Sequence, residues 1–134
     1  MAKKIALFKI TGDVTTAGFI YHLSSLLAQG GHCVLMVDAD PQCNLTSLVL
    51  LSKRESSFEE FYQCEPERNI FAGLSPVFDK DLGSISPIEC LPITRKNDIF
   101  LLPGNVRLIE YEACIECCRD LPGMEHSPLN YESA

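Results

Sequence analysis

Two aspartates that follow a short apolar run are the residues of this chain best suited to chemistry. The run covers residues 33–37 and leads to Asp38 and Asp40, after which Pro41 ends the extended segment. In open α/β sheets, ligands bind just outside the carboxyl ends of the strands. Two carboxylates at such a place suit a magnesium ion or a water molecule that must be activated. The alternative is an ordinary polar turn, since turns favour Asp and Pro for conformational reasons.

The elements around the two aspartates predict a strand–helix–strand unit. An apolar run at Ile5–Lys9 has the length of a strand, and the turn-like residues 11–18 follow it. Residues 19–29 then place four apolar side chains on one helical face, and Gly30–Gly31 ends that helix. A second strand is expected at Cys33–Asp38 and a third at Ile99–Leu102, with a right-handed crossover between the first two. The sequence therefore predicts an α/β fold with a parallel sheet.

Two sequence strings carry a resemblance to a known family. The first is Asp38-Ala-Asp-Pro-Gln-Cys-Asn-Leu-Thr46, and the second runs from Leu101-Leu-Pro-Gly104 to Glu110-Tyr-Glu112. Together with the order of the elements, they resemble the amino-terminal part of the ParA/MinD-type partitioning ATPases, which have a deviant Walker-A motif. The resemblance implies a P-loop NTPase-like parallel β-sheet flanked by helices in three α/β/α layers. It also implies plasmid or chromosome partitioning as the class of function and ATP with Mg²⁺ as cofactors.

The resemblance also assigns roles to individual residues, and here the chain departs from the family. Asp40 corresponds to the catalytic aspartate that orients the attacking water, and Asp38 lies near the metal. The family carries K-G-G-V-G-K-T-T before its first helix, and a gapless placement sets residues 11–18 on that motif. Thr11 and Thr16 then replace the two lysines, and Ala17 replaces the hydroxyl that binds magnesium. The nucleotide-binding positions by this placement are Gly12, Asp13, Val14, Thr15, Thr16 and Ala17.

The altered loop predicts weak binding of a triphosphate or none. A phosphate cradle uses glycines to turn backbone N–H groups inward, a lysine for the β- and γ-phosphates and a hydroxyl for magnesium. Only Gly12 and Val14 agree with the family motif, and Asp13 adds a negative charge where the phosphates would lie. We therefore expect no hydrolysis, with Asp40 a vestigial catalytic residue.

The domain organisation is predicted as one incomplete domain at residues 1–123 and a polar tail at 124–134. No apolar strand ending in Asp follows Cys118, so the sequence predicts truncation before Walker B. Three functions stay open: a degenerate ParA-like protein, an atypical nucleotide binder completed by another chain, and a non-enzymatic interaction module acting on a full-length ParA-type partner. A homodimer or a heterodimer with such a partner is expected, because a shortened sheet exposes an edge and apolar faces.

Composition limits the other partners. The net charge of −7 argues against direct binding of nucleic acid, which needs clustered Lys and Arg. No apolar run is long enough to cross a membrane, and a cytoplasmic location is expected.

The seven cysteines include Cys114, Cys117 and Cys118, which could hold a metal or form a redox pair, although reduced cysteines that pack as small apolar residues are the simpler interpretation. In the middle of the chain, residues 56–62 predict a capped helix and residues 69–74 a helical turn.

Overall fold

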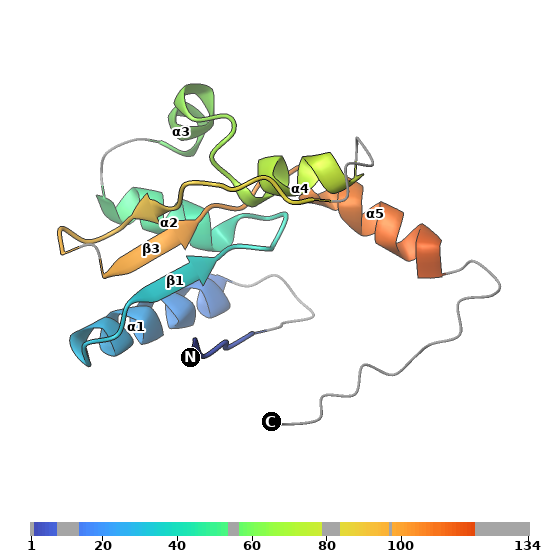
Figure 1. Ribbon diagram of the computed structural model, residues 1–134. Helices are drawn as coiled ribbons and strands as arrows, with labels where there is room; N and C mark the ends of the chain where they lie inside the picture. Colours follow the sequence, from blue (N-terminus) through green and yellow to red (C-terminus); the bar gives the residue numbers. More distant parts are fainter. Residues whose placement is uncertain (1, 8–13, 54–56, 79–83, 97, 120–134) are drawn as a thin grey trace.

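The structure is a computed structural model that describes residues 2–7, 14–53, 57–78, 84–96 and 98–119. Its elements, in chain order, are α1 (Val14–Gln29), β1 (Val34–Val37), α2 (Asn44–Lys53), α3 (Phe58–Cys64), α4 (Ile70–Phe78), β2 (Leu91–Pro92), β3 (Ile99–Leu102) and α5 (Leu108–Arg119). Figure 1 shows a small sheet with helices around it, and α4 and α5 lie beyond the carboxyl ends of β1 and β3. The predicted α/β class with flanking helices is confirmed.

The sheet has the strand order β1-β3-β2 and is mixed. β1 and β3 run parallel with Val34 opposite Ile99 and Val37 opposite Leu102, so the second and third predicted strands are confirmed. β2 pairs antiparallel with the other edge of β3. The two described strands that the sequence predicted are thus parallel, as expected, whereas β2, which was not predicted, makes the sheet mixed.

The first predicted strand is not formed in the part of Ile5–Lys9 that the structure describes. Residues 2–7 have no regular secondary structure and are exposed, including Ile5 at 67% and Leu7 at 41%. Residues 8 and 9 lie outside the described residues. An apolar run becomes a strand only where another strand accepts its backbone hydrogen bonds, and no described strand pairs with residues 2–7.

The main core lies on the face of the sheet that α1 and α2 cover. Met36 of β1 and Leu101 of β3 are neighbours in the sheet register and point to the same side. They pack with Ala17 of α1 and with Leu45 and Val49 of α2, and all five are buried. Side chains alternate along a strand, so Leu35 and Val37 point to the opposite side, where they are 53% and 45% exposed. In the part of the chain that the structure describes, no helix covers Leu35 and Val37.

The insert after α2 contains two helices where the sequence predicted helical segments. Ser57 is the N-cap of α3: its side chain accepts from the Glu60 N–H at 3.2 Å, and the Glu60 carboxylate accepts from the Ser57 N–H at 2.8 Å. This reciprocal pair is a capping box. α4 is longer than the predicted turn at residues 69–74, and Asn69 accepts from the Ala72 N–H at its start. A second cluster, of Phe71, Leu108 and Tyr111, joins α4 to α5.

Two further expectations are only partly covered by the described residues. The polar tail at residues 124–134 lies outside them, so the division into two segments stays a prediction. Among the described residues, no helix is long and apolar enough to cross a membrane.

Candidate functional site

The turn between β1 and α2 places Asp38 inside the protein. Its carboxylate is only 3% exposed. One oxygen, Oδ2, accepts from the Thr46 N–H at 2.8 Å and from the Thr46 hydroxyl at 2.6 Å. Thr46 lies in the first turn of α2, where backbone N–H groups have no partner within the helix. Asp38 therefore caps α2 from eight residues upstream and ties the end of β1 to that helix.

Thr46 extends this connection to the end of β3. Its hydroxyl donates to Asp38 and accepts from the Gly104 N–H at 2.9 Å. The Gly104 backbone also accepts a hydrogen bond from the Tyr62 hydroxyl of α3. A side chain at position 104 would meet the Asp38 carboxyl and the Cys43 sulfur at 3.1 Å, so the close approach requires glycine. Four segments of the chain thus meet around one buried carboxylate.

Asp40 lies at the surface of the same turn. Its Oδ1 accepts from the Gln42 N–H at 2.9 Å, and its backbone oxygen accepts from the Cys43 N–H at 2.9 Å. Cys43 adopts a φ of 53°, the left-handed conformation that non-glycine residues rarely take. The Asp40 N–H approaches Asp38 Oδ1 at 3.4 Å, which is a weak interaction. The turn therefore exposes one aspartate and buries the other.

The electrostatics of the turn follow from this burial. Loss of water raises the pKa of Asp38 above its ordinary value, against the opposing effect of the two Thr46 hydrogen bonds. Burial, with the negative charges of Asp38 and Asp40, raises the pKa of the Cys43 thiol to about 12. Burial also raises the pKa of Tyr62. At neutral pH the thiol and the phenol therefore stay protonated.

The predicted nucleotide-binding residues are only partly described. Gly12 and Asp13 lie outside the described residues, and α1 begins at Val14, so the last four positions lie in its first turns. Thr16 is half-buried, and Ala17 is 5% exposed within the main core. The side chain that occupies the position of the magnesium-binding hydroxyl thus serves the packing of α1.

No described group of three or more His, Cys, Asp or Glu side chains could hold a metal ion. The side chains of Cys114, Cys117 and Cys118 lie outside the described part of the chain, so the suggestion of a metal or redox pair there stays a prediction. Asp38 is described, and its oxygen Oδ2 is already shared by two donors from Thr46.

Several residues of this site were not singled out from the sequence. Thr46 and Gly104 were quoted within the two family strings, but their pairing links positions 58 residues apart. No sequence pattern pointed to Arg68, which lies near β2.

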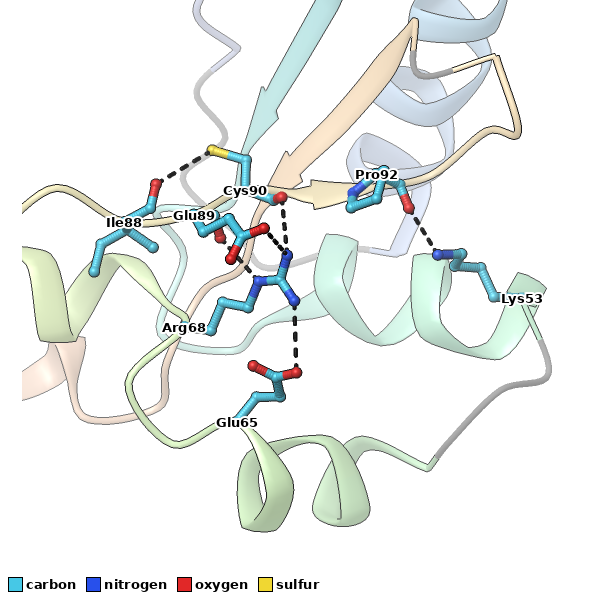
Figure 2. Close-up of polar contacts among 7 residues, drawn as sticks. All are labelled: Lys53, Glu65, Arg68, Ile88, Glu89, Cys90 and Pro92. Carbon is cyan, nitrogen blue, oxygen red and sulfur yellow. Dashed lines mark hydrogen bonds and ion pairs between the residues drawn. The ribbon is translucent and has the colours of Figure 1, made fainter.

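Figure 2 shows the Arg68 guanidinium between Glu65 and Glu89 and close to the backbone oxygen of Cys90. Arg68 also donates to the Glu89 backbone oxygen at 3.0 Å. It thereby fixes the segment that leads into β2.

Lys53 supports the same edge from the other side. Its ammonium group donates to the Pro92 backbone oxygen at 2.7 Å, which joins the end of α2 to β2 (Figure 2). The short strand β2 is thus held at its two ends by cations from outside the sheet.

Comparisons with known proteins agree with this architecture. A family described as an AAA domain matches residues 2–120. The chain is 31% identical, over 102 residues, to a protein of Sinorhizobium fredii described as a replication protein A; the match covers 76% of this chain and 21% of that protein. The crystal structure of protein DIP2308 from Corynebacterium diphtheriae superposes with a TM-score of 0.63 at 24% identity, and the match covers 77% of this chain and 35% of that one.

The chain therefore spans about a fifth of the length of the Sinorhizobium relative and about a third of the superposed structure. The likeness to the Corynebacterium protein concerns the fold alone. ATP and Mg²⁺ are the general cofactors of P-loop ATPases. Because the AAA-domain match extends over most of the chain, this protein belongs to that family of ParA/MinD-like P-loop domains.

Proposed function

We propose that this chain is a ParA-like domain of the partitioning class in which the aspartate turn is structural, ATP binds weakly or not at all, and hydrolysis is absent. The observation that carries the proposal is the pair Thr16 and Ala17 at the positions of the lysine and the magnesium-binding hydroxyl. Thr16 has no positive charge for the phosphates. Ala17 has no oxygen to give, and its burial in the core explains why an apolar residue is favoured there.

The aspartate turn supports the same proposal. Asp38 Oδ2 accepts two hydrogen bonds from Thr46 inside the protein, so binding a metal through that oxygen would compete with the cap of α2. Asp40 is exposed and could meet water, but the aspartate turn itself, residues 38–44, contains no cation for a triphosphate. The residues present therefore do not fit magnesium-bound ATP, and no step of hydrolysis is derived for this chain.

The test is a calorimetric titration with ATP and Mg²⁺. The natural sequence should give no saturable binding up to about 1 mM ATP, a limit that corresponds to about −4 kcal/mol. The matched variant carries Thr11→Lys, Asp13→Gly, Thr15→Gly, Thr16→Lys and Ala17→Thr together, which returns both lysines, both glycines and the hydroxyl to the loop. Circular dichroism must show that this variant still folds, because Ala17 is buried.

The expected contrast is gain of binding in the restored variant and none in the natural chain. Saturable binding by the natural chain in the micromolar range would refute the proposal, since it would require a cationic group that replaces the lysines. Asp40→Asn in the restored background should leave ATP affinity nearly unchanged, because the proposed role of that position in the family concerns the attacking water.

A further inference from the structure

The short helix α3 is the most weakly packed element beside the aspartate turn. It has seven residues, all of them described, and only Phe61 among them is buried. Neither the main core nor the cluster that joins α4 to α5 contains a residue of α3. Figure 1 shows α3 at the margin of the molecule, next to α2. An isolated helix of this length is marginal at best in water, so its few contacts with the rest of the chain decide whether it stays in place.

Tyr62 is the contact that joins α3 to the aspartate turn. Its hydroxyl donates to the Gly104 backbone oxygen, and the Gly104 N–H is bonded to Thr46. The Gly104 backbone is so close to the turn that a Cβ there would lie 3.1 Å from Asp38 and from Cys43. Burial, with the nearby Cys43 and Asp38, raises the pKa of Tyr62. The Tyr62 hydroxyl therefore lies beside the two buried side chains of the turn.

The carboxyl end of α3 is attached to the protein by a separate set of contacts. Glu65 follows the helix and leaves the helical conformation, with φ −129° and ψ 56°. Arg68 pairs with the Glu65 carboxylate at 3.5 Å. Arg68 also donates to the backbone oxygens of Glu89 and Cys90 at 3.0 and 3.2 Å (Figure 2). These contacts hold the bend after α3 whether or not the Tyr62 hydrogen bond is formed.

We propose that α3 is a lid on the aspartate turn, attached at the Glu65 bend and held closed by Tyr62. When the Tyr62–Gly104 hydrogen bond breaks, α3 moves away and the two buried side chains of the turn become accessible while the sheet stays folded. The structure shows the closed state, with Asp38 3% and Cys43 0% exposed. In the open state water and cations reach Asp38 Oδ1, which only a weak contact of 3.4 Å occupies. The lid needs no nucleotide, so it does not depend on the proposal about ATP.

The thiol of Cys43 reports opening of the lid, because iodoacetamide can reach it only when the turn is exposed. Peptide mapping by mass spectrometry follows the rate of its alkylation in the full chain. Opening of α3 alone exposes little surface, so this rate should depend only weakly on urea at low concentrations. Alkylation that requires unfolding of the whole domain would instead rise steeply with urea.

Two tyrosine variants test the hydrogen bond that closes the lid. Tyr62→Phe keeps the ring and removes the hydroxyl, and it should raise the alkylation rate of Cys43 by about fivefold, as loss of one ordinary hydrogen bond from the closed state predicts. Tyr21→Phe is the matched control. It removes a hydroxyl that joins α1 to Ser52 of α2 at 3.5 Å, away from α3, and should leave the rate unchanged.

Ser57→Ala tests whether α3 moves as a unit. Ser57 caps the amino end of α3, and its side chain accepts from the Glu60 N–H within that helix. Loss of this cap weakens the helix, so the variant should also raise the Cys43 alkylation rate, by about twofold or more, whereas a purely local effect of Tyr62 on the thiol would not respond. The proposal is overturned if the rate follows urea as steeply as global unfolding does. It is also overturned if Tyr62→Phe or Ser57→Ala leaves the rate unchanged, or if Tyr21→Phe raises it as much.

Discussion

The hydroxyl of Thr46 is the part of the site whose loss should have the clearest effect. It is fully buried, donates to Asp38 at 2.6 Å and accepts from the Gly104 N–H at 2.9 Å. Thr46→Val keeps the branched shape of the side chain and removes the hydroxyl that makes these two hydrogen bonds. The variant therefore isolates the link between β1, α2 and the end of β3.

The magnitude follows from what each partner loses. A buried backbone N–H left without an acceptor costs about 1–3 kcal/mol, and a hydrogen bond to a charged group contributes about 1.5–3 kcal/mol. The added methyl group of valine returns about 0.8 kcal/mol. We expect the free energy of unfolding to fall by about 3 kcal/mol in Thr46→Val. Thr46→Ser keeps the hydroxyl and loses only a methyl group, so its cost should be about 1 kcal/mol.

Urea denaturation followed by circular dichroism measures both variants under the same conditions. A double-mutant cycle with Asp38→Asn then tests whether the loss comes from the contact itself, because the two changes should be strongly non-additive. If the serine variant is as unstable as the valine variant, or if the cycle shows no coupling, the hydroxyl does not form the link described here.

Three other predictions concern the same region and its surroundings. The pKa of Asp38 is raised above its ordinary value of 3.8, so the folded state holds this proton more tightly than the unfolded state does. The stability that Asp38 adds relative to Asp38→Asn should therefore be greatest below pH 3.8 and should fall as the pH rises through the folded-state pKa. Urea denaturation of both proteins across that pH range measures this difference, and a difference independent of pH would contradict the prediction. Cys43 should resist iodoacetamide at pH 8, because its side chain is fully buried and its pKa is raised to about 12, whereas the exposed Cys33 and Cys64 should react. Peptide mapping by mass spectrometry measures the labelling of each cysteine, and equal labelling of the three would disprove the prediction. Gly73→Ala should lower the free energy of unfolding by about 1–3 kcal/mol, because the added Cβ would lie 2.9 Å from Ile88. Gly18→Ala has open space around it in α1 and should raise the free energy of unfolding by about 0.5–1 kcal/mol. The melting temperatures of the two variants should therefore shift in opposite directions from that of the natural chain.

The local parts of the fold could be predicted because short-range chemistry controls them. The apolar run before Asp38 and the break at Pro41 predict a strand and a turn within about ten residues, and the structure has β1 followed by a turn there; the helix α2 that comes next was not predicted. The capping box at Ser57 and Glu60 was likewise readable, since both partners lie within one helical turn. The family resemblance came from these same strings, and the AAA-domain match agrees with it.

The non-local parts were decided only by the tertiary structure. The sequence placed Asp38 and Asp40 at the end of a strand, but it did not show that Asp38 is buried and bonded to Thr46 while Asp40 is exposed. The bond from Gly104 to Thr46 joins residues far apart in the chain, and no local pattern encodes such a pair. The apolar run beginning at Ile5 resembles a strand as well as β1 does, yet residues 5–7 pair with no described strand. Composition and spacing determine which segments are able to form strands and turns, whereas burial and pairing depend on which neighbours the folded chain provides.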